Sequence, residues 1–152
     1  IHKEVDFRNL PDTILNNTTT QSVLSAQQPF LTGYRNRLQE LIQLCKANGT
    51  TPILLTQPSL YGAYTDPATG VVMNNKYLPI GDNARNNLLQ EQILESYNDV
   101  VRSFRSEVPV IDLAQLMPKN TSLYYDFIHF NKAGAAEVAS LLAGALQPLL
   151  KQ

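Results

Sequence analysis

The sequence contains few cysteine and histidine residues, and it lacks long apolar runs and glycine-rich loops. Cys45 is its single cysteine, so the chain forms no internal disulfide and no cysteine-based zinc site. Its two histidines are too few for most zinc sites, and no apolar run approaches the roughly 20 residues of a membrane-spanning helix. It has neither a phosphate-cradling glycine-rich loop nor a cysteine pair, which argues against a doubly wound nucleotide-binding or redox domain.

The charges are almost balanced. Lys and Arg number 12, and Asp and Glu number 13, giving a net charge of −1. This balance argues against nucleic acid as a partner, because nucleic-acid binders usually carry a basic excess. With 152 residues, 43% hydrophobic and 16% charged, the composition is typical of one globular domain, with no second domain.

Hydrophobic spacing predicts a first helix that begins near Phe30. Its apolar stripe, at i, i+3, i+4 and i+7, consists of Leu38, Leu41, Ile42 and Cys45. The pair Asn48-Gly49 predicts its end, because glycine tolerates the left-handed cap conformation. Residues 9–29 are polar and turn-rich, which predicts a loop with at most a short helix.

Two further helices are expected. The second is capped by Asp82 or Asn83, and the third begins at about Lys132 with Asn131 as its N-cap. The stripe of the second helix is Ile93, Tyr97, Val100, Val101 and Phe104. The buried stripe of the third helix is Val138, Leu141, Leu142, Ala145 and Leu149.

Two apolar segments, Pro52–Pro58 and Val108–Leu113, predict buried strands. The order helix, strand, helix, strand, helix indicates parallel strands with right-handed crossovers, and therefore an α/β fold with three layers, α/β/α. Two strands make a poor sheet, so the sequence predicts an incomplete portion of such a fold. Residues 59–82 form a long connection, expected to be either a lid or binding loop, or a surface excursion without a role.

The sharpest local feature is Asp126-Phe127-Ile128-His129. If these residues form a turn, the Asp126 carboxylate accepts a hydrogen bond from His129 Nδ1, which fixes the tautomer and leaves Nε2 to act as a general base. Imidazole suits this role because its ordinary pKa, roughly 6.5, lies near working pH. On spacing alone, the alternative is a surface turn with an Asp cap.

Five segments together resemble the C-terminal half of the SGNH (GDSL-type) esterase/lipase family, over roughly four fifths of the chain. The most specific is Asp126–Gly134, which looks like the last conserved block of the family. The other four are the predicted helix Tyr34–Ala47 and the segments Asn48–Pro58, Tyr97–Val101 and Val110–Leu113. The resemblance implies a flavodoxin-like α/β/α fold with a parallel sheet, of which residues 1–152 are the C-terminal portion.

The resemblance also implies hydrolysis of a small acyl or acetyl ester by a serine nucleophile, without a metal or other cofactor. His129 matches the general base and acid, and Asp126 matches the residue that orients it. The family's serine lies in an early Gly-Asp-Ser motif, which does not occur here; Gly81-Asp82-Asn83 is a near miss, because Asn is no nucleophile. The family's Gly-x-Asn-Asp block, which contributes to the oxyanion hole, is also missing.

We therefore expect the nucleophile and oxyanion hole upstream of Ile1, on the missing N-terminal half of the same domain or on a separate or cleaved chain. The start Ile1-His2-Lys3-Glu4, without an initiator Met or signal peptide, predicts a processed product or a piece of a longer chain. Alone, this chain is expected to be inactive. The family resemblance favours a periplasmic or secreted location.

Three residues near the end of the first strand, Gln57, Ser59 and Tyr61, are candidates for substrate binding, because α/β ligand sites gather at the carboxyl ends of strands. The alternative for them is loop packing. The alternative function is a non-catalytic module that binds a carbohydrate or a protein partner, and the sequence upstream of Ile1 would discriminate the two.

Overall fold

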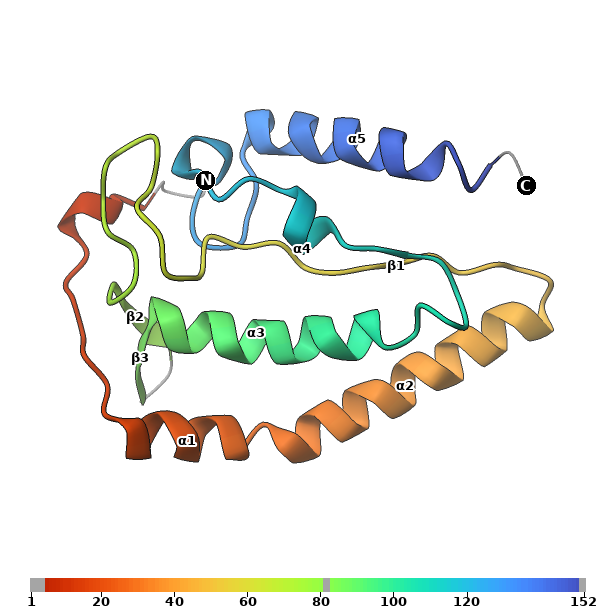
Figure 1. Cartoon of the computed structure of the whole chain (residues 1–152), viewed down its shortest axis with the longest axis horizontal. Coiled ribbons are helices and arrows are strands. Elements are labelled where there is room, and N and C mark those ends of the chain that lie inside the picture. The colour runs from red at the N-terminus through yellow and green to blue at the C-terminus, as the bar shows by residue number, and fades with distance from the viewer. Residues whose placement is uncertain (1–4, 81–82, 151–152) are drawn as a thin grey trace.

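A computed structural model describes residues 5–80 and 83–150 of the chain (Figure 1). The helices are α1 (Asn17–Ser25), α2 (Gln28–Ala47), α3 (Asn87–Arg102), α4 (Leu113–Leu116) and α5 (Lys132–Leu146). The strands are β1 (Leu54–Leu55), β2 (Tyr77–Ile80), β3 (Asn83–Asn86) and β4 (Val110–Ile111). Short 3₁₀ helices occur at Phe7–Asn9 and Thr121–Leu123.

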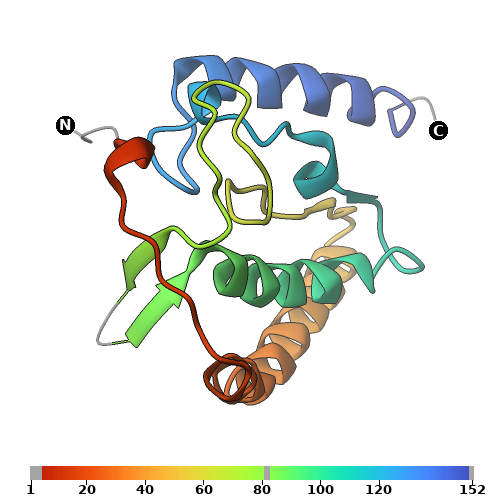
Figure 2. The same ribbon diagram turned by 60° about the vertical axis from the view of Figure 1, so that its left-hand side comes forward.

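The two predicted strands pair in parallel, β1 with β4, in the register Leu54↔Val110 and Leu55↔Ile111. The expectation that both are buried is wrong for β1, because Leu55 is 41% exposed. The Leu54 N–H donates to the Pro109 carbonyl at 3.0 Å, and the Thr56 N–H donates to the Ile111 carbonyl at 3.2 Å. Figures 1 and 2 show α5 on one side of this pair and α3 on the other, with α2 packed against α3. The expected α/β character with parallel strands is therefore confirmed.

A second pair of strands lies within and after the long connection. Strands β2 and β3 form an antiparallel pair, with Tyr77 opposite Asn86 and Leu78 opposite Arg85. Sequence patterning did not predict this hairpin, because its segments are short and mix apolar with polar residues. It brings the start of α3 beside residues 74–76, where the Asn87 and Leu88 N–H groups donate to the Lys76 and Asn74 carbonyls.

This hairpin corrects the predicted start of the second helix. Helix α3 begins at Asn87, and the side chain of Asn86 caps it by accepting from the Leu89 N–H at 2.9 Å. Asn83 is part of β3 instead, and Asp82 lies outside the described residues. The N-cap of the last helix was predicted correctly, since the Asn131 side chain accepts from the Gly134 N–H at 3.0 Å.

One hydrophobic cluster joins α2 to α3. Its buried members are Ile42, Val100, Phe104 and Val108. The predicted stripe of α2 is only partly buried: Ile42 is fully buried, whereas Leu41 is 50% exposed. Leu41 was therefore wrongly expected in the core, because α2 contacts α3 along a line narrower than the stripe.

The predicted stripe of α5 is also less buried than expected. Gly134 is the one fully buried residue of this helix, and the four stripe residues within it are half-buried. Leu149, the fifth, lies beyond the end of α5 at Leu146.

A larger cluster packs against and within residues 59–80, the described part of the long connection. Its buried members are Phe7, Leu60, Tyr61, Met73, Leu78, Met117, Tyr124 and Phe127. The carboxylate of the fully buried Asp66 accepts hydrogen bonds from the N–H and hydroxyl groups of both Thr69 and Thr121, at 2.5–2.8 Å. The connection is thus packed into the core and tied to the segment that precedes Asp126.

Within the part of the chain that the structure describes, no helix is both long and apolar enough to cross a membrane.

Candidate functional site

A tight loop between Tyr124 and Phe130 holds the Asp-x-x-His motif. Its ends are joined by an antiparallel bridge between these two residues, and the Tyr125 N–H donates to the His129 carbonyl at 2.8 Å. Inside the loop, Asp126 Oδ1 accepts from the N–H groups of Ile128 and His129, each at 2.9 Å. This turn places the two side chains of the motif on the same side of the loop.

The second carboxylate oxygen of Asp126 contacts the imidazole. Asp126 Oδ2 lies 2.8 Å from His129 Nδ1, the arrangement that the spacing predicts. Burial acts to raise the pKa of Asp126, but the hydrogen bonds from Ile128 and His129 outweigh it and hold that pKa below its ordinary value. The carboxylate is therefore charged at neutral pH, and it favours the tautomer of His129 that carries its proton on Nδ1.

His129 lines a pocket of about 470 Å³ at the carboxyl end of β1. The lining residues are Gln57, Tyr61, Gln90, Ile93, Leu94, Tyr97, Ile128 and His129. The side chain of His129 is 58% exposed, so the ring is accessible from solvent, whereas Asp126 lies behind it and is 31% exposed. Among the described residues that line the pocket there is no serine, threonine or cysteine.

Two of the three predicted substrate residues, Gln57 and Tyr61, thus lie in the same pocket as His129, and Ser59 does not line it. The hydroxyl of Ser59 accepts from the Tyr61 N–H at 3.2 Å, so it shapes the turn that leads to Tyr61. A role for these residues in binding substrate stays a prediction.

Tyr61 is held from several sides. Its ring stacks on Phe127, with centroids 5.5 Å apart, and its carbonyl accepts from Lys119 Nζ, which also forms an ion pair with Glu91 at 2.6 Å. Burial, with a contribution from the Asp126 charge, raises the pKa of Tyr61 despite the opposing effects of Gln90 and Arg85. The phenol is therefore neutral in the physiological range and presents a hydroxyl group to the pocket.

The backbone of Gln57 is fixed by a buried amide on α3. Asn98 is 2% exposed; its Oδ1 accepts from the Gln57 N–H at 2.8 Å and its Nδ2 donates to the Gln57 carbonyl at 3.1 Å. These bonds join the end of β1 to the helix that forms the floor of the pocket.

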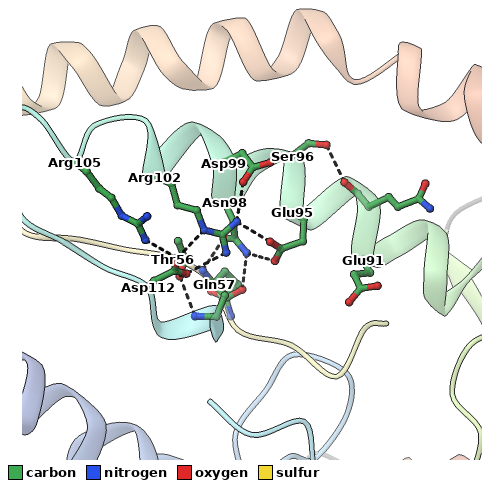
Figure 3. A network of polar contacts seen from close by, with 12 residues as sticks. Thr56, Gln57, Glu91, Glu95, Ser96, Asn98, Asp99, Arg102, Arg105 and Asp112 are labelled. Atoms are coloured by element: carbon green, nitrogen blue, oxygen red, sulfur yellow. Dashed lines mark hydrogen bonds and ion pairs between the residues drawn. The ribbon is translucent and has the colours of Figure 1, made fainter. Parts of the chain in front are cut away.

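A charged network continues from this amide (Figure 3). Asn98 Nδ2 donates to Glu95, and Arg102 binds Glu95, Asp99 and Asp112 at 2.7–2.8 Å. Asp112, directly after β4, also accepts from the hydroxyl of Thr56, directly after β1, at 2.9 Å. The network thus locks the carboxyl ends of both parallel strands to α3.

Electrostatics agree with the geometry of this network. Burial acts to raise the pKa of Asp112, but hydrogen bonds from Arg102, Thr56 and Arg105 hold it below its ordinary value. Contacts with Asp112 raise the pKa of Arg102, so the pair stays charged throughout the physiological range.

Sequence reasoning missed Gln90, Asn98, Arg102 and Asp112. A signal for Asn98 was present: asparagine is a weak helix former, so its occurrence within α3 beside an apolar stripe indicates a side-chain hydrogen bond that compensates. Arg102 and Asp112 belong to different elements, so no local pattern pairs them.

The described residues contain no group of three or more His, Cys, Asp or Glu side chains that could hold a metal ion. The fold and site define a mixed α/β chain with an Asp–His pair beside a largely apolar pocket. Comparisons with family models, curated proteins and solved structures find no match to this chain.

Proposed function

We propose that this chain supplies the acid–base part of a serine ester hydrolase. The observation that carries the proposal is the 2.8 Å contact between Asp126 Oδ2 and His129 Nδ1 at the edge of a pocket. A carboxylate on Nδ1 orients the ring and stabilises the imidazolium that forms when Nε2 accepts a proton. The five segments that resemble the SGNH family support the same assignment.

In the proposed reaction, a serine hydroxyl attacks the ester carbonyl while His129 Nε2 accepts the hydroxyl proton. The tetrahedral intermediate then expels the alcohol, which receives that proton from Nε2. Water next attacks the acyl-serine, His129 accepts a proton from the water, and return of the proton to the serine releases the carboxylic acid. Asp126 stays ionised throughout.

The nucleophile is proposed to lie on a polypeptide segment outside these 152 residues, together with the oxyanion hole. The pocket lining supports this placement, because its described members offer a base but no serine, threonine or cysteine, and their hydroxyl groups are the phenols of Tyr61 and Tyr97. We also propose that the small parallel sheet is part of the larger three-layer sheet of an SGNH-type domain, since two strands with Leu55 41% exposed leave apolar surface uncovered.

A non-catalytic binding module is the second candidate. The same observation favours it, because a pocket without a serine can hold a carbohydrate or a segment of a protein without hydrolysing a bond.

The two candidates differ in whether His129 is needed for turnover. Hydrolysis of p-nitrophenyl butyrate is measured with the natural protein, isolated with every polypeptide that accompanies it, and with its His129→Gln variant. An enzyme loses its activity in the variant, while a binding module shows no hydrolysis in either form.

A further inference from the structure

We infer that the pocket beside His129 binds the uncharged, apolar acyl group of an ester, several carbons long, rather than a charged acyl group or a sugar. This inference rests on the proposed function and names the substrate class of the same site. The juxtaposition that carries it is an apolar face of α3 opposite Ile128, next to the imidazole.

The floor of the pocket is one face of a helix. Gln90, Ile93, Leu94 and Tyr97 lie at i, i+3, i+4 and i+7 of α3, so their side chains point in one direction. Three of these four are apolar or aromatic. Across the pocket lies Ile128, 37% exposed, directly before His129 in the chain. Covering Ile128 with an acyl chain removes apolar surface from water at the site of reaction.

Most charged side chains around the pocket are engaged with one another. Arg85 is the exception: it donates to Gln90 Oε1 at 3.0 Å, and it is not itself among the lining residues. Glu91 forms an ion pair with Lys119 at 2.6 Å, and Glu95 forms one with Arg102 at 2.7 Å. Asp126 is occupied by the turn and by His129. Apart from His129 itself, no ionisable acid or base with a normally charged side chain is among the described lining residues, so a charged acyl group finds no counter-ion on the pocket wall.

The polar groups of the lining are the amides of Gln57 and Gln90, the hydroxyls of Tyr61 and Tyr97 and the imidazole of His129, and both amides are already partly used. Gln90 Oε1 accepts from Arg85 at 3.0 Å, and Gln57 Nε2 donates to the Pro58 carbonyl at 3.1 Å. A sugar has several hydroxyl groups that lose their hydrogen bonds to water on burial, and this lining cannot replace them all. A hydrocarbon chain has no such requirement.

The experiment uses the 152-residue chain, which is expected not to hydrolyse its ligand, and titrates it with methyl butanoate, methyl hexanoate and methyl octanoate. Binding is followed by the NMR shifts of the Ile93 and Ile128 methyl groups. We expect affinity to rise about fourfold for each methylene until the pocket is filled, since a buried methylene contributes about 0.8 kcal/mol. Sodium hexanoate and N-acetylglucosamine are expected to bind at least tenfold more weakly than methyl hexanoate. The reason is that the carboxylate or the sugar hydroxyls lose their hydration on entering the pocket.

The matched variants are Ile93→Asp, which places a charge on the pocket floor, and Gln92→Asp, which places it on the neighbouring, exposed position outside the lining. Ile93→Asp should weaken methyl hexanoate at least tenfold and Gln92→Asp less than twofold. Should Ile93→Asp fail to fold, Ile93→Ala replaces it and is expected to weaken binding by about tenfold or less, because it removes apolar contact without adding charge.

Three outcomes would each overturn the inference. The affinity could be independent of the length of the acyl chain; hexanoate or the sugar could bind as tightly as the ester; or the two Asp variants could bind methyl hexanoate equally well. These outcomes concern binding by this chain alone. They are therefore distinct from failure of the proposed function, which is the absence of hydrolysis by the natural protein.

Discussion

The side chain of Asn98 satisfies both backbone hydrogen-bonding groups of Gln57. Oδ1 accepts from the N–H at 2.8 Å, and Nδ2 donates to the carbonyl at 3.1 Å. The amide thus acts as a neighbouring strand would, at the point where β1 has ended and the chain turns towards the pocket. It fixes the position of Gln57 relative to α3, and with it one wall of the candidate site.

We predict that Asn98→Ala destabilises the chain by about 1–3 kcal/mol, because it removes a buried amide and leaves the partly buried N–H and carbonyl of Gln57 without their partner. The control is Asp99→Ala on the next residue of α3, whose side chain is 71% exposed and forms an i,i+3 ion pair. It should cost less than about 1 kcal/mol. Urea unfolding followed by circular dichroism measures both, and similar costs would show that the Asn98 amide does not anchor β1.

The second prediction concerns the two arginines that bind Asp112. Arg102 is 14% exposed and Arg105 is 52% exposed, yet both contact the same carboxylate. Arg102→Met should destabilise by about 3–5 kcal/mol, because Asp112, Glu95 and Asp99 lose the cation that they share. Arg105→Met should cost under about 1 kcal/mol. If chemical denaturation finds equal losses, the network is not organised around Arg102.

The third prediction is an acid-sensitive stability that depends on Asp66. Burial acts to raise the pKa of Asp66, but hydrogen bonds from Thr69 and Thr121 hold it below its ordinary value. A carboxyl group with a lowered folded pKa stabilises the fold above its unfolded pKa of ~3.9, and this contribution disappears as the pH falls through the folded value.

The wild-type chain should therefore lose stability as the pH falls below ~4. Thr121→Val, which removes one hydroxyl donor to Asp66 Oδ2, should flatten this dependence, and Asp66→Asn should flatten it further. Thermal unfolding as a function of pH tests this order. An unchanged acid slope in Asp66→Asn would contradict the assignment.

The fourth prediction concerns the proton on His129. In the wild type, Asp126 Oδ2 favours a proton on Nδ1, whereas the side-chain N–H of an asparagine would donate to Nδ1 and leave the proton on Nε2. Asp126→Asn should retain the fold, because an amide oxygen can still accept from Ile128 and His129 N–H, but it should shift the tautomer. Long-range ¹H–¹⁵N NMR of the neutral ring measures this, and an unaltered tautomer would show that Asp126 does not orient the imidazole.

Much of the fold was predictable where the signal is local. The parallel strands follow from short apolar runs, the cap at Asn131 from residue type, and the Asp126–His129 contact from a spacing that a turn can close. The β2–β3 hairpin was not predicted because its residues show no clear alternation of apolar and polar side chains. Without the hairpin, the start of α3 was predicted too early, at Asp82 or Asn83 instead of Asn87.

The walls of the site were harder to predict because they depend on contacts between distant segments. Gln57 and Tyr61 were selected from their place after a strand, but Ser59 has the same place and turns its hydroxyl to the backbone N–H of Tyr61. Asn98 acts on Gln57 across 41 sequence positions, and no spacing rule connects them. Leu41 was predicted in the core but is 50% exposed. The helical period of the apolar residues defines a face of the helix, but it does not tell how much of that face a neighbouring element covers.

We propose His129 as the general base of an ester hydrolase whose nucleophile lies outside these 152 residues. The most direct test measures hydrolysis of p-nitrophenyl butyrate by the purified chain, checked by mass spectrometry to hold no other polypeptide, and by the natural protein with and without His129→Gln. We predict no rate above background for the chain, activity for the natural protein, and a loss on the order of 10⁴–10⁶-fold in its variant. Turnover by the chain alone would show that the nucleophile lies within these 152 residues, and full activity of the His129→Gln protein would show that His129 is not the base.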